Sequence, residues 1–232
     1  MTGSGGTAIA RQLLVRRCDR WGRLAGVVSQ TPSKRGRPAG GSSEVTYDRI
    51  ISAARRIFAE RGYAAAQNRA VAELAQMTTS SLYHYFDSKL ALYAAVFTEA
   101  EALVAKRYRE ALETPNEPAT AITAVLEAAR TLYREDPTIP SFLAGVPIEM
   151  RNHPEVSDAI AQCEVTTAGV LLALFEDAKE KGLLGPGVNA FGLAAVLFAS
   201  TTGIALFAQT PMGFTYEEMI EALTHLTNGT AF

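Results

Sequence analysis

Apolar residues return every three or four positions along most of this 232-residue chain, in segments separated by proline and glycine. In the first segment they form one stripe that comprises Ile50, Ile51, Ala54, Ile57 and Phe58, which is the spacing of one face of an α-helix. No segment shows the strict apolar–polar alternation of a half-buried strand. The pattern therefore predicts an all-α protein.

The positions of the breaks predict about nine helices. The first begins near Thr46, a residue type that caps helix N-termini, and ends at Arg61-Gly62. After the first four helices, the breaks predict helices at Ala119–Arg134, near Ser141–Arg151, from Pro154 to about Lys181, at Val188–Gln209 and at Thr215–Thr227.

Two short helices and a long one follow the first helix. The second contains Val71 and Leu74, and Thr78 caps a third at Thr79–Tyr85, whose Leu82, Tyr85 and Phe86 are expected to face the core. Asp87-Ser88 caps a long fourth helix. Three short helices with a tight turn between the second and third form a helix-turn-helix, whose third helix enters the major groove of DNA.

The net charge of −2 conceals a gradient along the chain. Residues 1–43 carry eight basic groups and one acidic group, a net charge of +7, and residues 44–93 carry +1. Residues 94–232 carry −10. A basic front end on an acidic body indicates that the front end has a polyanionic partner.

The composition is that of a globular protein of the cytoplasm. With 48% hydrophobic residues the chain can bury a core, and Cys18 and Cys163 are too few for a disulfide framework. The arginine-rich start lacks the apolar stretch of a secretory signal. Phe191–Ala208 is long enough to be weighed as a membrane span, but Ser200, Thr201 and Thr202 favour a buried interface helix without membrane contact.

Hydroxyl side chains cluster where the third helix begins. Thr78, Thr79, Ser80 and Ser81 are short enough to reach base edges and phosphates, and the helix N-terminus attracts phosphate oxygens. Tyr83 and His84 lie on the predicted exposed face of this helix, although each also fits an ordinary packing or surface position. Lys89 adds a positive charge where the next phosphate is expected.

A longer set of residues resembles a known family. Gly62-Tyr63, Arg69, Val71-Ala72 and the run Ser81–Leu92 are similar to the DNA-binding signature of tetracycline-repressor-type (TetR) regulators. The resemblance covers roughly residues 46–96 and is carried mainly by Leu-Tyr-His-Tyr-Phe-x-Ser-Lys. It implies a repressor that is released from its operator by a small-molecule effector.

Two positions depart from that signature. The family usually has glycine where this chain has Gln76, so Gln76 is expected to adopt a left-handed backbone. The usual N-cap of the second helix falls at Ala66 or Gln67, neither of which is a Ser or Thr, and Asn68 is the predicted substitute. The departures affect the ends of the second helix and leave the motif intact.

A second candidate DNA contact lies ahead of the first helix. Lys34-Arg35-Gly36-Arg37-Pro38 is similar to an AT-hook core, in which arginines lie in a narrow minor groove. The alternative is a basic tail that binds polyanions loosely. The predicted DNA contacts are Arg37, Asn68, Arg69, Thr78, Thr79, Ser80, Ser81, Tyr83, His84 and Lys89.

A single helix-turn-helix makes few contacts, so a homodimer on a palindromic double-stranded DNA operator is expected. Small residues recur every four positions in the eighth helix, which lets a second helix approach closely. The family resemblance implies that the ninth helix completes a four-helix interface. The predicted dimer residues are Leu193, Ala195, Ala199, Gly203, Phe207 and Leu223.

The resemblance also implies an effector pocket among helices four to seven, for a ligand expected to be apolar, whose binding shifts the fourth helix. The candidate lining residues are Tyr133, Phe142, Glu149, Met150, Leu171 and Phe175. The chain thus divides into a disordered basic arm (1–43), a DNA-binding domain (44–93) and an effector-binding and dimerisation domain (94–232).

An enzyme is the main alternative from another class. The sequence contains no P-loop, no strand-led G-x-G-x-x-G, no H-E-x-x-H and no G-x-S-x-G. The three histidines lie on separate predicted helices without metal-ligand spacing, so neither a metal nor a cofactor is expected. A helical adaptor that binds no DNA and a membrane-associated protein are the remaining alternatives.

Overall fold

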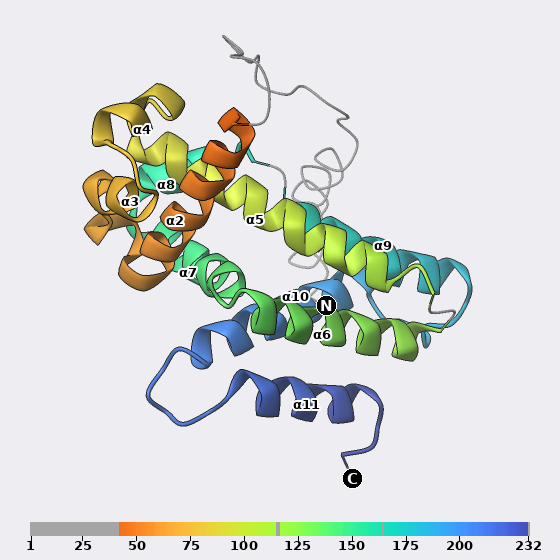
Figure 1. Ribbon diagram of the computed structural model, residues 1–232. Coiled ribbons are helices and arrows are strands. Elements are labelled where there is room, and N and C mark those ends of the chain that lie inside the picture. Colours follow the sequence, from red (N-terminus) through yellow and green to blue (C-terminus); the bar gives the residue numbers. More distant parts are fainter. Residues whose placement is uncertain (1–41, 115–116, 164, 232) are drawn as a thin grey trace, which may run out of the picture. The chain divides into compact units, whose positions relative to one another are not determined.

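The computed structural model describes residues 42–114, 117–163 and 165–231, and in these ranges it contains ten helices and no strand (Figure 1). The all-α prediction is confirmed. Arg37 and the rest of the AT-hook-like segment lie outside the described residues, so their predicted roles stay predictions.

The three helices of the predicted helix-turn-helix are α2 (Ser42–Ala65), α3 (Asn68–Leu74) and α4 (Thr79–Tyr85). α2 packs against α3, and α3 against α4. Val71 from α3 and Leu82 from α4 are almost completely buried, in the same hydrophobic core as the apolar stripe of α2. The helical geometry of α2 breaks at Gly62, where φ is 71° and ψ is 175°, which is the position where the sequence predicts the first helix to end.

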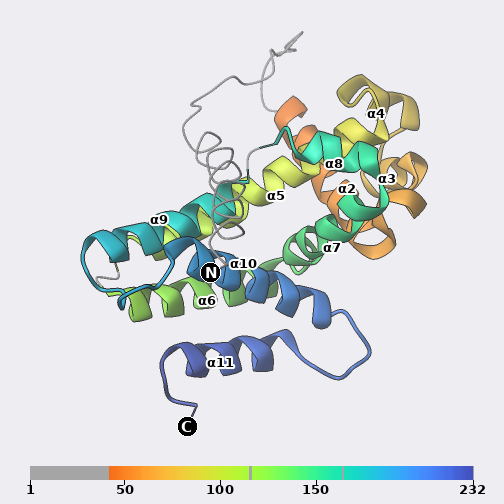
Figure 2. The same cartoon turned by 180° about the vertical axis from the view of Figure 1, so that it is seen from behind.

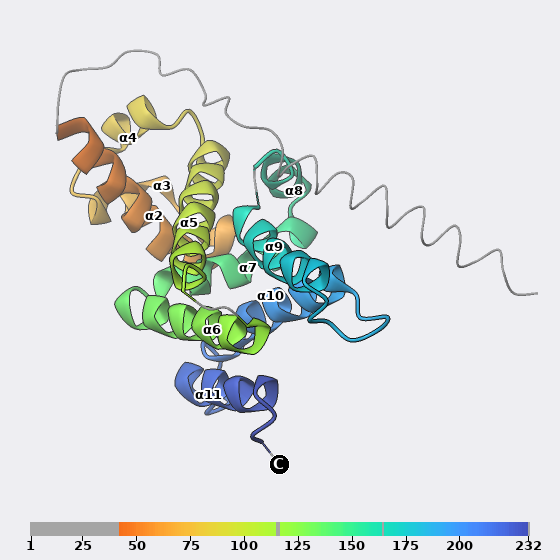
Figure 3. The same cartoon turned by 90° about the vertical axis from the view of Figure 1, so that its right-hand side faces the viewer.

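A long helix, α5 (Lys89–Ala111), leads away from this group and packs against α2 at one end and α6 (Pro118–Glu135) at the other (Figures 1 and 3). Its N-cap Ser88 accepts a hydrogen bond from Ala91 N at 3.0 Å, as the sequence predicts. α5 also contacts the three helices that follow α6, so one continuous helix connects the predicted helix-turn-helix with the rest of the described chain.

α7 (Thr138–Asn152) begins three residues earlier than expected. Pro140 lies in its first turn, where a missing N–H breaks no helical hydrogen bond. Asp136 supplies the missing acceptor at this end, because its Oδ1 accepts from Thr138 N at 3.0 Å.

The prediction of one helix from Pro154 to Lys181 is wrong, because the structure has two, α8 (Pro154–Ile160) and α9 (Thr166–Glu180). The apolar spacing continues in register across the break, from Ile160 to Thr167, so periodicity alone does not reveal it. A tertiary contact stabilises the new N-terminus: Glu101 of α5 accepts from Thr167 N at 3.0 Å.

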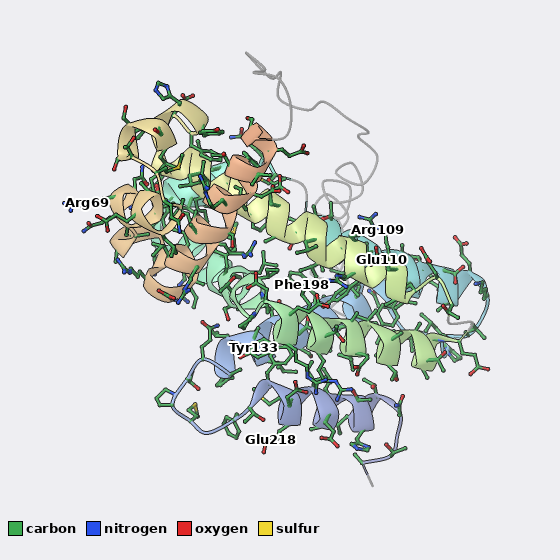
Figure 4. The ribbon with its side chains drawn as sticks, viewed as in Figure 1. Arg69, Arg109, Glu110, Tyr133, Phe198 and Glu218 are labelled. Carbon is green, nitrogen blue, oxygen red and sulfur yellow. The ribbon has the colours of Figure 1, made fainter. Side chains whose placement is uncertain are left out.

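The last two helices are α10 (Ala190–Phe207) and α11 (Tyr216–Thr227). α10 packs against α9 and α7, and α11 packs against α6 (Figure 2). The rings of Tyr133 and Tyr216 stack with centroids 3.9 Å apart, between α6 and α11 (Figure 4). α10 is long and apolar enough to cross a membrane by length and composition alone, and 28% of it is buried among the described residues.

Candidate nucleic-acid interface

Helix α4 presents a polar face to solvent. Its N-cap Thr78 accepts from Ser81 N at 3.1 Å, so the capping prediction is confirmed, and the Thr78 and Ser81 hydroxyls lie 2.8 Å apart. Leu82 is buried beneath the helix, whereas Ser80, Tyr83 and His84 are exposed and Thr79 is half-buried. The exposed side therefore offers hydroxyl and imidazole groups from a rigid, capped helix.

The turn between α3 and α4 has the geometry that the sequence predicts. Gln76 has φ of 53°, and among the described residues other than glycine it alone has positive φ. Met77 N donates to Ala72 O at 2.9 Å and closes the turn. The tight turn sets the angle at which α4 leaves α3.

Asn68 does not cap α3, so that prediction is wrong: the N-cap is Gln67, which makes no side-chain capping bond. Asn68 is instead the first residue of the helix, and its Nδ2 donates to Tyr83 Oη at 3.2 Å. This bond connects the start of α3 to the exposed face of α4 and restrains the Tyr83 ring. Arg69 points away from the neighbouring helices, and its Nε donates to Glu73 Oε1 at 2.8 Å (Figure 4).

Lys89 has a structural role that sequence reasoning missed. Its Nζ donates to Tyr63 O at 2.8 Å and to the carbonyls of Ala64 and Ala66 at 3.2 Å each, and it lies 4.6 Å from the Tyr63 ring centroid. These acceptors match the three donors of the ammonium group. Lys89 thus fixes the connection between α2 and α3, and no spacing in the sequence indicates this.

Tyr85 is 38% exposed, so the prediction that it faces the core is wrong. α4 has only seven residues, and Leu82 and Phe86 already occupy its buried side. Tyr85 consequently extends the polar and aromatic surface formed by Tyr83 and His84.

The sequence profile described as "Bacterial regulatory proteins, tetR family" matches residues 50–96, which span α3, α4 and most of α2. The chain is a TetR-family transcriptional regulator.

Other TetR-family regulators resemble it over most of their length. The HTH-type transcriptional regulator UidR of Escherichia coli is 25% identical over 162 residues, which cover 70% of this chain and 81% of UidR. FadR from Bacillus subtilis, in a complex with stearoyl-CoA, superimposes with a TM-score of 0.67 at 19% identity, over 79% of this chain and 98% of FadR. AibR, in a complex with isovaleryl coenzyme A and operator DNA, superimposes with a TM-score of 0.61 at 18% identity, over 78% of this chain and 97% of AibR.

The junction between the DNA-binding helices and the remaining helices of this TetR-family regulator is an aromatic cluster. Phe58 and Tyr63 from the end of α2 meet Tyr93 of α5, with ring centroids 4.9 Å and 5.3 Å away. Phe142 of α7 lies 5.1 Å from Tyr93. Glu149, also on α7, accepts from Tyr63 N at 3.0 Å.

The predicted effector residues separate into two groups. Phe142 and Glu149 line one cavity of about 160 Å³ between α2, α5, α7 and α10. Tyr133 is stacked on Tyr216, Leu171 and Phe175 are buried core residues, and half-buried Met150 does not line that cavity. No group of three His, Cys, Asp or Glu side chains within the described ranges is arranged to hold a metal ion.

The predicted dimer residues lie on the outer side of α10 and on α11. Ala195, Ala199 and Phe207 are exposed, and Leu193, Gly203 and Leu223 are half-buried. Sequence reasoning missed Val196, which is 65% exposed. The exposed side of α10 is therefore apolar, like the side that packs against α9.

Proposed function

We propose that this TetR-family regulator binds a palindromic operator as a homodimer, represses transcription, and leaves the operator when a small molecule binds. It acts in the cytoplasm by binding rather than by catalysis, as the transcriptional regulators related to it do. The proposed parts are the arm (1–43), the DNA-binding domain (44–93) and the effector and dimer domain (94–232). The observation that carries the proposal is the capped helix α4, with its exposed Tyr83 and His84.

The proposed DNA contacts follow from the exposure of α4 and its surroundings. Ser80, Tyr83 and His84 face solvent on the helix that enters the major groove, and Thr79 lies beside them. Thr78 and Ser81 bind each other, so they are proposed to shape the helix N-terminus as well as to approach a phosphate. Arg69 extends outward from α3 toward solvent, where a phosphate is an alternative partner to Glu73.

The homodimer is supported by the unpartnered side of α10. An 18-residue helix whose exposed side carries Val196, Ala199 and Phe207 leaves an apolar strip in contact with water in a single subunit. Small residues at 199 and 203 allow a second α10 to approach closely. Two subunits are also what a palindromic site requires.

Response to a small molecule is supported by structural neighbours that were solved with ligands. FadR was solved with stearoyl-CoA and AibR with isovaleryl coenzyme A and operator DNA. In this chain α5 connects the DNA-binding helices to the others. A ligand that binds more tightly to the protein with α5 in one position than in another therefore changes the affinity for DNA.

Selection of bound sequences from a random DNA pool with the full-length protein tests the proposal. We expect a palindrome whose half-sites lie about one helical turn, or a multiple of it, apart. Tyr83→Ala and His84→Ala should each weaken binding to the selected site about tenfold or more. Thr120→Ala, an exposed polar residue on α6, is the control and should leave affinity unchanged. Binding without sequence preference would contradict the proposal.

A further inference from the structure

A cavity of about 160 Å³ lies where the DNA-binding helices meet the rest of the described chain. α2 contributes Phe58, Ala59 and Gly62, α5 contributes Tyr93, α7 contributes Ser141, Phe142, Gly145, Ile148 and Glu149, and α10 with its C-terminal end contributes Leu206 and Gln209. An apolar protein cavity of about 150 Å³ holds a benzene molecule, so this one has room for a ligand of about six non-hydrogen atoms.

The lining has the chemistry of a cation site. Glu149 is its acidic residue, and none of the residues that line the cavity is basic. Three of them, Phe58, Tyr93 and Phe142, are aromatic, and aromatic ring faces attract ammonium groups. Burial raises the pKa of the Tyr93 hydroxyl, and the negative charge of Glu149 raises it further, so this ring stays neutral beside the carboxylate.

The Glu149 carboxylate retains room for another donor. Oε1 accepts from Tyr63 N at 3.0 Å, and Oε2 lies 3.4 Å from His153 Nε2. Two carboxylate oxygens offer about four acceptor positions, so these contacts do not exhaust them. The carboxylate is therefore placed to receive a ligand ammonium group from the cavity side.

The same carboxylate also holds the break in α2. A Cβ atom on Gly62 would lie 2.5 Å from Glu149 Oε1, and Gly62 has φ of 71°, so a larger residue here would be strained and would push the carboxylate away. Tyr63 N donates to Glu149 of α7, and Tyr63 O accepts from Lys89 of α5. Any ligand that draws Glu149 toward the cavity weakens its bond to Tyr63 N–H, one of the bonds that fix the α2–α3 connection.

We propose that this cavity binds a small organic ammonium ligand with Glu149 as its counter-ion, and that the bound ligand draws Glu149 away from Tyr63 N–H and lowers affinity for DNA. Phe142 and Glu149, two of the residues that the sequence predicts to line the pocket of an apolar effector, line this cavity, so the proposal changes the expected ligand from apolar to cationic. The DNA effect rests on the proposed function, whereas ligand binding at the cavity does not.

Isothermal calorimetry on the full-length protein tests the binding step without DNA. Isopentylamine and cyclohexylamine are the probes, and isopentyl alcohol and cyclohexanol are neutral controls of the same size. We expect the amines to bind at least about tenfold more tightly than the alcohols, a difference of about 1.4 kcal/mol, since a charge-assisted hydrogen bond to the carboxylate is stronger than a neutral one. Absence of amine binding at about 10 mM, or equal binding of amine and alcohol, would overturn the site.

Two variants separate charge from space. Glu149→Gln keeps a carbonyl oxygen for Tyr63 N–H but removes the charge, so it should fold and lose about tenfold or more in amine affinity. Gly145→Leu puts a side chain into the cavity from a position where an added Cβ meets no atom within 4 Å. This variant should block binding of the amines and of the alcohols. Unchanged amine affinity in both variants would place the ligand elsewhere and overturn the proposal.

Operator affinity and hydrogen exchange test the coupling. With wild-type protein, saturating amine should weaken operator binding about fivefold or more and speed exchange of the Tyr63 amide, with neither effect in Glu149→Gln. Amine binding that changes neither quantity would refute the coupling. A protein that binds no operator with or without amine would refute the proposed function, and calorimetry would still decide the site.

Discussion

Arg55 in α2 and Asp136 at the corner between α6 and α7 form an ion pair, with 2.5 Å between Nη2 and Oδ2, although 81 positions separate them in sequence. Arg55 Nε also donates to Thr138 Oγ1 at 3.0 Å, and Thr138 N donates to Asp136 Oδ1 at 3.0 Å. The three residues close a network that fixes the first DNA-binding helix to the adjacent helices, so the position of α2 depends on this corner.

Loss of that network should destabilise the fold. Arg55 is 9% exposed, so Arg55→Leu leaves Asp136 without its charged partner in a partly buried place, and we expect a loss of about 2 kcal/mol in the free energy of unfolding. Urea denaturation measures it. The control is Arg56→Leu, whose partner Glu60 lies one turn along the exposed side of α2, and we expect it to change the free energy of unfolding much less than Arg55→Leu does. Equal losses would show that the network contributes no more than a surface pair.

Two helix caps separate stability from DNA contact. Thr78→Ala and Ser88→Ala each remove a side-chain acceptor, from Ser81 N and Ala91 N, so each should cost about 1 kcal/mol. Only Thr78 begins the proposed recognition helix. We therefore expect Thr78→Ala to weaken operator binding about tenfold and Ser88→Ala to change it less than about threefold, measured by fluorescence anisotropy. A similar loss in both variants would argue against a special role for the start of α4.

The turn before α4 is strained at Gln76. A left-handed backbone costs a non-glycine residue about 1 kcal/mol, so Gln76→Gly should raise the free energy of unfolding by about 0.5–1 kcal/mol. Thermal unfolding followed by circular dichroism measures the change. Ser52→Gly, at an exposed helical position of α2, should have the opposite sign and lower stability by about 0.5–1 kcal/mol. A loss of stability in Gln76→Gly would mean that the glutamine side chain makes a stabilising contact.

Local patterns in the sequence predict much of this fold. Periodicity locates most helices, Thr78 and Ser88 mark two helix starts, and departure from the family signature identifies the left-handed Gln76. These features depend on neighbours along the chain, which the sequence shows directly.

The remainder depends on contacts between distant segments. At the break between α8 and α9, Thr167 N donates to Glu101, 66 residues earlier in the sequence, and the Glu149–Tyr63 bond spans 86 residues. The sequence predicts Lys89 as a phosphate ligand. The three carbonyls that accept from it come within reach only when α2 and α5 pack together. Periodicity likewise does not distinguish Val196, exposed on α10, from its buried neighbour Leu197.

The buried Glu101 predicts a pH dependence of stability. Burial raises the pKa of its carboxyl above the ordinary 4.5, although Thr167 N–H and hydroxyl groups counteract part of this. The folded state therefore holds the proton more tightly than the unfolded state, and Glu101 makes the free energy of unfolding fall as pH rises from about 4.5 through the folded pKa.

Glu101→Gln removes this titration and keeps an oxygen for Thr167 N–H. We expect the variant to resemble wild type in stability below about pH 4.5 and to exceed it at about pH 7, as measured by urea denaturation at each pH. Glu110→Gln, on the exposed side of α5, tests whether any loss of negative charge has the same effect. A constant difference between Glu101→Gln and wild type from pH 4 to 7 would refute the expected dependence.

The exposed side of α10 makes a prediction about assembly. A charged residue in the centre of an apolar interface loses its water, so Val196→Arg should convert the proposed dimer into monomers at micromolar concentration, as measured by analytical ultracentrifugation. Val45 in α2 is also 65% exposed, as Val196 is, so Val45→Arg introduces the same charge at the same exposure and should leave the dimer intact. Because each subunit then binds its half-site alone, the Val196→Arg protein should also lose most of its operator affinity, while its helical circular dichroism spectrum stays the same. A Val196→Arg protein that sediments as a dimer would place the interface on another face of the molecule.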